Sequence, residues 1–145
     1  MGKGDTVRVI LKCFLTVVFL LAALCKVYPH FHPEAFIDMD VMFREKIGPL
    51  WQDIVFDQFN YKMSSVNFKF MIGVSEILIV IMLWGGSRMS SLACALGFCV
   101  MVGATLTHYI LKEHIVFPFI LGTCFLVVLK LGMKSSKPVV VKKKN

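Results

Sequence analysis

Residues 89–110 read MSSLACALGFCVMVGATLTHYI and contain no Asp, Glu, Lys or Arg. A helix needs about 20 mostly apolar residues to cross the hydrocarbon core of a bilayer. This stretch therefore predicts a membrane-spanning helix, and it is the cleanest signal of this kind in the chain. Three more apolar runs accompany it, at residues 7–25, 66–84 and 115–131, so we expect four spans.

The overall composition agrees with a membrane protein. Of the 145 residues, 57% are hydrophobic and 17% are charged, whereas soluble domains average about 45–50% apolar and about 25% charged residues. A bilayer accounts for this excess of apolar residues better than one small core does. We expect a single membrane domain over residues 1–134 and a basic cytosolic tail over residues 135–145.

The connections between the later spans are short. Residues 85–87 (GGS) and residues 112–114 (KEH) predict tight turns after the second and third spans. Short connections place consecutive helices antiparallel and side by side. The predicted fold class is therefore all-α, a transmembrane four-helix up-down bundle.

The connection between the first and second spans, residues 27–65, is long and contains helical patterns. Pro33 is typical of a helix start, and Gly48-Pro49 is expected to end that helix. A second short amphipathic piece is expected around Trp51. These pieces either pack on top of the bundle, which the pattern favours, or lie at the level of the lipid headgroups.

The distribution of Lys and Arg predicts the orientation of the chain. Most of these residues fall on one side if the N-terminus is cytosolic, as the positive-inside rule requires. Four spans then place both termini in the cytosol and the long connection in the lumen. The basic residues behind the net charge of +7 are therefore expected to set the orientation of the chain in the lipid bilayer. No nucleic-acid partner is expected. A cleaved signal peptide is the alternative for residues 7–25, but LAAL at residues 21–24 is a poor cleavage site.

The chain ends in KKKN at residues 142–145. Lys142 and Lys143 stand four and three places from the C-terminus, the spacing of a retrieval signal for endoplasmic reticulum membrane proteins. The alternative is a basic anchor that only fixes orientation. The first interpretation predicts an endoplasmic reticulum location.

The sequence has no pattern typical of a disulfide framework, a metal site or an enzyme. The five cysteines fall in apolar runs without CxxC spacing, so we expect small buried hydrophobic residues. His30, His32, His108 and His114 are too weakly spaced to predict a metal site. No cofactor-binding or catalytic motif is found, so no cofactor and no enzymatic activity are expected.

Three ionisable residues are expected in the lumenal half of the bundle: Lys26, Glu76 and His108. A carboxylate in hydrocarbon is costly and must find a partner. We expect Glu76 to pair with Lys26 or His108, with Lys69 as a rival partner. A polar lock between helices is favoured over a substrate or proton site.

Small residues predict places where helices approach closely. Gly73 lies one turn from Glu76, and the third span contains two pairs of small residues spaced by four. The helix-packing residues predicted in this way are Gly73, Ala93, Gly97 and Gly103.

The order and spacing of these features resemble the DoxX-like family over residues 7–132. The matching features are FLLAALCK at residues 19–26, GVSE at residues 73–76 and His108. Within the family, the chain is most similar to small animal four-span proteins related to the nicotinic acetylcholine receptor chaperone NACHO. It departs from that chaperone in its short basic tail and in residues 53–62, which are closer to a shorter sister protein.

The resemblance implies a chaperone or assembly factor for oligomeric membrane proteins, with ligand-gated channel subunits as clients. Two other functions stay open. One is a redox-associated membrane subunit, since bacterial members of the family are linked to quinone or thiosulfate oxidation. The other is a small oligomeric transporter or channel that uses Glu76 and His108 as a polar path.

Overall fold

The computed structural model describes residues 2–135, and these residues form helices and turns with no strand among them. Four of the helices are long and apolar enough to cross a membrane. They are α1 (Lys3–Val27), α4 (Ser65–Leu83), α5 (Ser87–Ile110) and α6 (Val116–Ser135). The four predicted spans are thus confirmed as four apolar helices, each placed within a few residues of its expected range.

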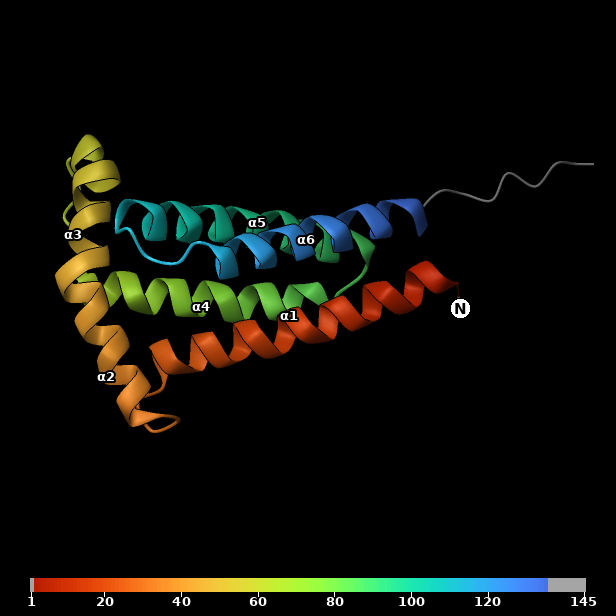
Figure 1. Cartoon of the computed structure of the whole chain (residues 1–145), viewed down its shortest axis with the longest axis horizontal. Coiled ribbons are helices and arrows are strands. Elements are labelled where there is room, and N and C mark those ends of the chain that lie inside the picture. Colours follow the sequence, from red (N-terminus) through yellow and green to blue (C-terminus); the bar gives the residue numbers. More distant parts are fainter. Residues whose placement is uncertain (1, 136–145) are drawn as a thin grey trace, which may run out of the picture.

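The four long helices lie side by side, as Figure 1 shows. Helix α1 packs against α4 and α6, and α5 packs against the same two helices. Each long helix therefore contributes one face to a shared interior.

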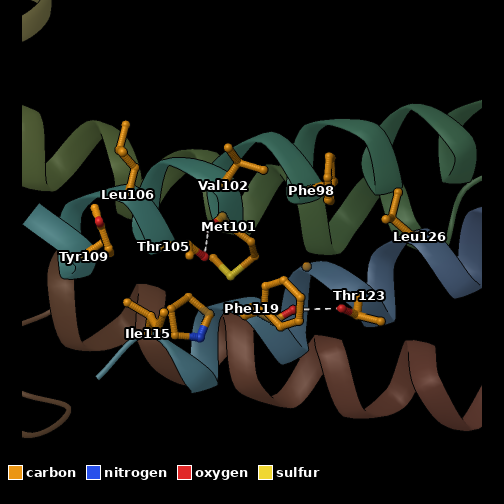
Figure 2. A pocket seen from close by; sticks show the side chains of 12 residues that line it. Phe98, Met101, Val102, Thr105, Leu106, Tyr109, Ile115, Phe119, Thr123 and Leu126 are labelled. Carbon is orange, nitrogen blue, oxygen red and sulfur yellow. Dashed lines mark hydrogen bonds between the residues drawn. The ribbon is translucent and has the colours of Figure 1, made fainter. Parts of the chain in front are cut away.

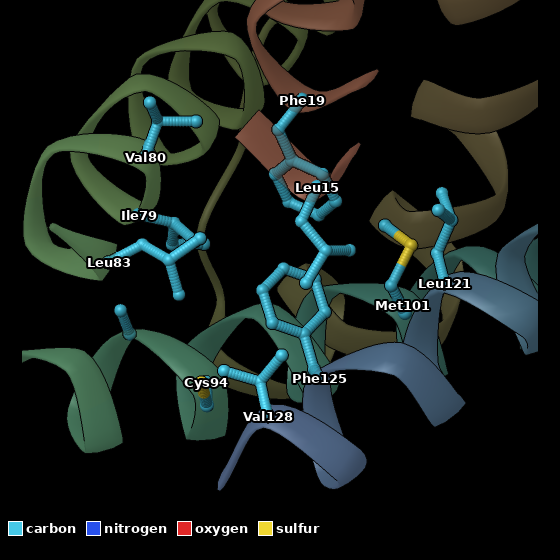
Figure 3. Packing of buried hydrophobic residues seen from close by; sticks show 11 residues of the cluster. Leu15, Phe19, Ile79, Val80, Leu83, Cys94, Met101, Leu121, Phe125 and Val128 are labelled. Atoms are coloured by element: carbon cyan, nitrogen blue, oxygen red, sulfur yellow. The ribbon is translucent and has the colours of Figure 1, made fainter. Parts of the chain in front are cut away.

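The shared interior is a cluster of apolar side chains from all four helices (Figure 3). The rings of Phe19 and Phe125 meet edge to face at its centre, with centroids 5.0 Å apart, a favoured aromatic geometry. The other members of the cluster are Leu15, Ile79, Val80, Leu83, Ala93, Cys94, Met101, Leu121 and Val128.

The outer surface of the bundle is apolar as well. Val17, Ile81 and Phe119 are among the many large hydrophobic residues exposed on the long helices. An apolar surface this extensive is unfavourable in water and is the surface expected of helices that face lipid. The cysteines follow the same division, because Cys94 is buried whereas Cys13 and Cys99 are exposed. The expectation of small buried residues therefore holds for Cys94 and is wrong for Cys13 and Cys99.

A nearly continuous helical segment at residues 33–59, here called the cap segment, lies across one end of the bundle (Figure 1). It comprises α2 (Pro33–Met42), the π-helix η1 (Phe43–Ile47), α3 (Gly48–Trp51), the π-helix η2 (Gln52–Phe56) and the 3-10 helix η3 (Asp57–Phe59). His32 precedes it and caps α2, since its Nδ1 accepts a hydrogen bond from the Ala35 amide at 3.2 Å.

The expected helix end at Gly48-Pro49 is wrong, because the helical path continues through both residues. The π-helical turn η1 shifts the hydrogen-bond register, and the Gly48 amide bonds to the Phe43 carbonyl. Pro49 then falls in the first turn of α3, where its missing N–H group costs little. Gly48 also lets the cap segment approach α4, because a Cβ atom there would collide with the Ser65 side chain.

Candidate functional site

The centre of the candidate site is an ion pair between α1 and α4. The Lys26 ammonium lies 2.9 Å from Glu76 Oε2 and 3.0 Å from Glu76 Oε1, and both residues are buried. Charged groups at this depth are rare and point inward, toward a partner. The structure therefore selects Lys26 among the partners predicted for Glu76.

The Lys26 ammonium has a third acceptor, the Ala22 carbonyl one turn earlier in α1, at 3.2 Å. An ammonium has three N–H donors, so its donors match the three acceptors around it. Both carboxylate oxygens of Glu76 are engaged by the same ammonium. The ion pair therefore joins the two helices with all three N–H donors of Lys26 in use.

Gly73 makes the close approach of α1 and α4 possible. A Cβ atom at this position would lie 2.5 Å from Val27 Cγ2 and 3.1 Å from Lys26 Cβ, closer than side-chain packing permits. Gly73 stands one turn before Glu76 on α4. The predicted packing role of Gly73 thus lies at the ion pair itself.

The structure does not place His108 with Lys26 and Glu76. Its Nδ1 lies 2.9 Å from Glu113 Oε2, in the turn that follows α5. Glu113 also accepts a hydrogen bond from Lys46 of the cap segment at 3.2 Å. Because Lys46, and secondly His108, hydrogen-bond the carboxylate, the pKa of Glu113 is held below its usual range. The predicted cluster of three residues is therefore divided between two sites.

Lys69, the rival partner for Glu76, instead anchors the cap segment. Its ammonium donates to Asp40 Oδ1 at 2.9 Å and lies 3.7 Å from the centre of the Phe36 ring, a cation–π contact. The hydrogen bond from Lys69 is the main cause that lowers the pKa of Asp40, and Arg44 adds to it. Sequence reasoning missed Asp40, although Phe36 and Asp40 are spaced to share one face of α2.

The predicted packing residues of α5 serve different neighbours. Ala93 is fully buried in the core, and Gly97 lies under the Phe125 ring, which a Cβ atom would strike. Gly103 instead faces Trp51 of the cap segment, 3.7 Å from where a Cβ atom would stand. The Trp51 indole donates to the Thr107 hydroxyl one turn further on, at 2.9 Å.

A groove of about 520 Å³ runs between α5 and α6 on the outside of the bundle (Figure 2). Thr105, Thr123 and Gly122 are the small residues in its lining. Both threonine hydroxyls bond to carbonyls of their own helices, those of Met101 and Phe119. The other lining residues are mostly large and apolar: Phe98, Met101, Val102, Leu106, Tyr109, Ile115, Pro118, Phe119 and Leu126.

The predicted retrieval signal at Lys142 and Lys143 lies outside the described residues. The buried charges that the structure describes at Lys26, Glu76 and Lys69 are matched across helix interfaces, which is an arrangement for binding helices together. No protein-family model, curated protein or solved structure matches the chain.

Proposed function

We propose that this chain is an assembly factor of the endoplasmic reticulum membrane. It would bind unassembled subunits of oligomeric membrane proteins, such as ligand-gated channels of the nicotinic acetylcholine type. The choice of client follows from the resemblance to the DoxX-like chaperone group. The observation that carries the proposal is the groove between α5 and α6.

The lining of the groove suits a transmembrane helix. It extends from Phe98 to Tyr109 along α5, which corresponds to about 16 Å at the helical rise per residue. Gly122 and the two threonines reduce the bulk between the helices, and small residues of this kind favour close helix approach in membranes. Single polar contacts between membrane helices contribute only about 0.6 kcal/mol, so binding would be reversible, as assembly of the client requires.

The proposed topology is an up-down bundle with both termini in the cytosol. The cap segment would then lie on the lumenal side, where it covers the ends of α4 and α5. The distribution of Lys and Arg supports this orientation. Lumenal placement brings the cap segment to the side on which the extracellular domains of channel subunits fold.

The test is affinity capture from mild-detergent membranes, with the tag at the N-terminus so that the C-terminal lysines stay free. We expect immature channel subunits carrying reticulum-type glycans to be enriched, as measured by mass spectrometry. Recovery of redox enzymes without channel subunits would contradict the proposal. Recovery of the chain alone would contradict it as well.

A groove-narrowing variant sharpens this test. A Cβ atom at Gly122 would make ordinary contacts, 3.4 Å from Met101 Cβ and 3.7 Å from Phe98. Gly122→Ala should therefore narrow the groove without disturbing the bundle, and client recovery should fall. The matched control is Val17→Phe, which adds bulk at an exposed apolar position of α1. Equal recovery with the two variants would remove the groove from the proposal.

A further inference from the structure

A small basic hollow lies at the end of the bundle opposite the cap segment. Asp5, Arg8, Val9 and Lys12 of α1 line it together with Trp84, which follows α4. Its volume is about 200 Å³, equivalent to about six or seven water molecules at liquid density. The hollow is separate from the groove and from the Lys26–Glu76 pair.

The contacts of Lys12 and Trp84 indicate the depth at which the hollow lies in the membrane. Its ammonium donates to the Leu83 carbonyl, the last residue of α4, at 2.6 Å. It also lies 5.6 Å from the centre of the Trp84 ring, and the Trp84 indole donates to Thr16 at 2.8 Å. Tryptophan is typical of the membrane–water interface. The hollow therefore lies at the boundary between hydrocarbon and headgroups.

Positively charged residues outnumber negatively charged ones in the lining of the hollow. Arg8 Nε is buried and has no hydrogen-bond partner, which is costly for a group of this kind. Lys12 has further N–H donors beyond the one that Leu83 accepts. The one acid in the lining, Asp5, accepts a hydrogen bond from the Gly2 amide at 3.2 Å within the first turn of α1.

We propose that this hollow binds the phosphate of an anionic phospholipid. Guanidinium groups match the geometry of phosphate oxygens, and both Arg8 and Lys12 line the hollow, where a phosphate would balance their positive charge. Basic pockets at the ends of membrane helices are typical sites for lipid headgroups. The exposed apolar residues Val9 and Ile10 lie along the adjoining face of α1, where acyl chains would run.

The test compares ligands on the purified full-length protein in neutral detergent micelles. We expect phosphatidic acid to raise the melting temperature by several degrees. Phosphatidylcholine and inorganic phosphate at the same concentration should have little effect. Equal stabilisation by inorganic phosphate would assign the hollow to a free anion and overturn the lipid proposal, and so would equal stabilisation by phosphatidylcholine.

Two variants distinguish specific binding in the hollow from a general attraction of anionic lipid to a basic protein. Arg8→Gln removes the guanidinium that lines the hollow, whereas Arg88→Gln removes an exposed charge at the same end of the bundle. The stabilisation by phosphatidic acid should be lost in the first variant and kept in the second. Equal loss in both variants, or full stabilisation of Arg8→Gln, overturns the proposal.

A measurement on otherwise native protein covers the case in which Arg8→Gln does not fold. Phosphatidic acid with a spin label high on its acyl chain should quench Trp84 fluorescence more strongly than labelled phosphatidylcholine does. Trp84→Phe gives the background from Trp51, which lies in the cap segment. Equal quenching by the two labelled lipids contradicts a selective site.

Discussion

Two Lys–Glu pairs hold this molecule together at different depths. The Lys26–Glu76 pair joins α1 and α4 at 2.9 Å, and the Lys46–Glu113 pair joins the cap segment to the turn after α5 at 3.2 Å. The side chains of the first pair are 9% and 6% exposed, and those of the second are 53% and 26% exposed. The two pairs have similar chemistry and similar distances. Breaking them should nevertheless change the free energy of unfolding by very different amounts, because only the first pair is removed from water.

The largest effect is expected from breaking the buried pair on one side. Glu76→Ala leaves the Lys26 ammonium without its counter-charge, which typically costs about 3–5 kcal/mol when the site is buried. Unfolding in mixed micelles with increasing denaturing detergent measures this loss. Glu76→Gln should cost less, because the amide oxygen still accepts one hydrogen bond.

Two double variants test whether the pair is only a lock. Exchanging the charges, Lys26→Glu with Glu76→Lys, should recover part of the stability lost in either single variant. Replacing both by apolar residues, Lys26→Met with Glu76→Leu, should come close to wild-type stability. If the apolar variant is stable but captures no client, the pair has a role beyond holding α1 to α4.

The second effect concerns Lys69 and Asp40, whose side chains are 2% and 22% exposed. Asp40→Asn leaves the buried Lys69 ammonium with a neutral partner. Hydrogen bonds to charged groups contribute about 1.5–3 kcal/mol, so we expect a loss in this range. Protease cleavage within the cap segment should also become faster, since Lys69 anchors this segment to α4. Asp38→Asn, at an exposed position of the same helix, is the control.

Asp40 also predicts a pH dependence. Its pKa is lowered in the folded protein, chiefly by the hydrogen bond from Lys69. The stability it contributes is present above the usual aspartate pKa and is lost as the pH falls through the lower folded value. The difference in melting temperature between wild type and Asp40→Asn should therefore be full near pH 7 and shrink in strong acid. A difference that stays constant down to that range would contradict this linkage.

The third effect compares two glycines that face helices at different distances. Gly73→Ala places a Cβ atom 2.5 Å from Val27 Cγ2, so the Val27 side chain or α1 itself must shift. Such overpacking typically costs about 1–3 kcal/mol, and it should weaken the neighbouring ion pair. Gly103→Ala meets Trp51 at 3.7 Å and should be tolerated. Equal melting temperatures for the two variants would argue against a tight α1–α4 contact.

The smallest effect is expected at the exposed pair. Glu113→Gln should cost no more than about 1 kcal/mol, since solvent-exposed ion pairs contribute about 0–1 kcal/mol. Added salt should reduce the difference further, because exposed charges are screened. A loss as large as that of Glu76→Ala would show that the Glu113 site is more buried in the membrane than its exposure indicates.

The candidate site could be predicted in part. The sequence identifies Lys26 and Glu76 because ionisable residues inside apolar runs must face a partner. Consecutive spans run antiparallel, so the end of the first span and the start of the second lie in the same half of the bundle. His108 was assigned to the same cluster on the same argument, but the turn after α5 supplies Glu113 five residues away. The spacing of Phe36 and Asp40 indicates a shared face of α2, but the contact of Asp40 with Lys69 depends on the cap segment folding back over the start of α4. The path through Gly48-Pro49 was also beyond sequence reasoning, because a π-helical turn changes which amide groups need partners.

The sequence by itself determined the number and places of the membrane helices and the pairing of charge with apolar surroundings. These properties follow from local composition, because a bilayer excludes polar groups wherever the chain crosses it. Only the tertiary structure decided which charges meet, which face of α5 receives the cap segment, and where the groove and the basic hollow form. These features depend on the rotation and approach of each helix, which are set by contacts between residues far apart in the chain.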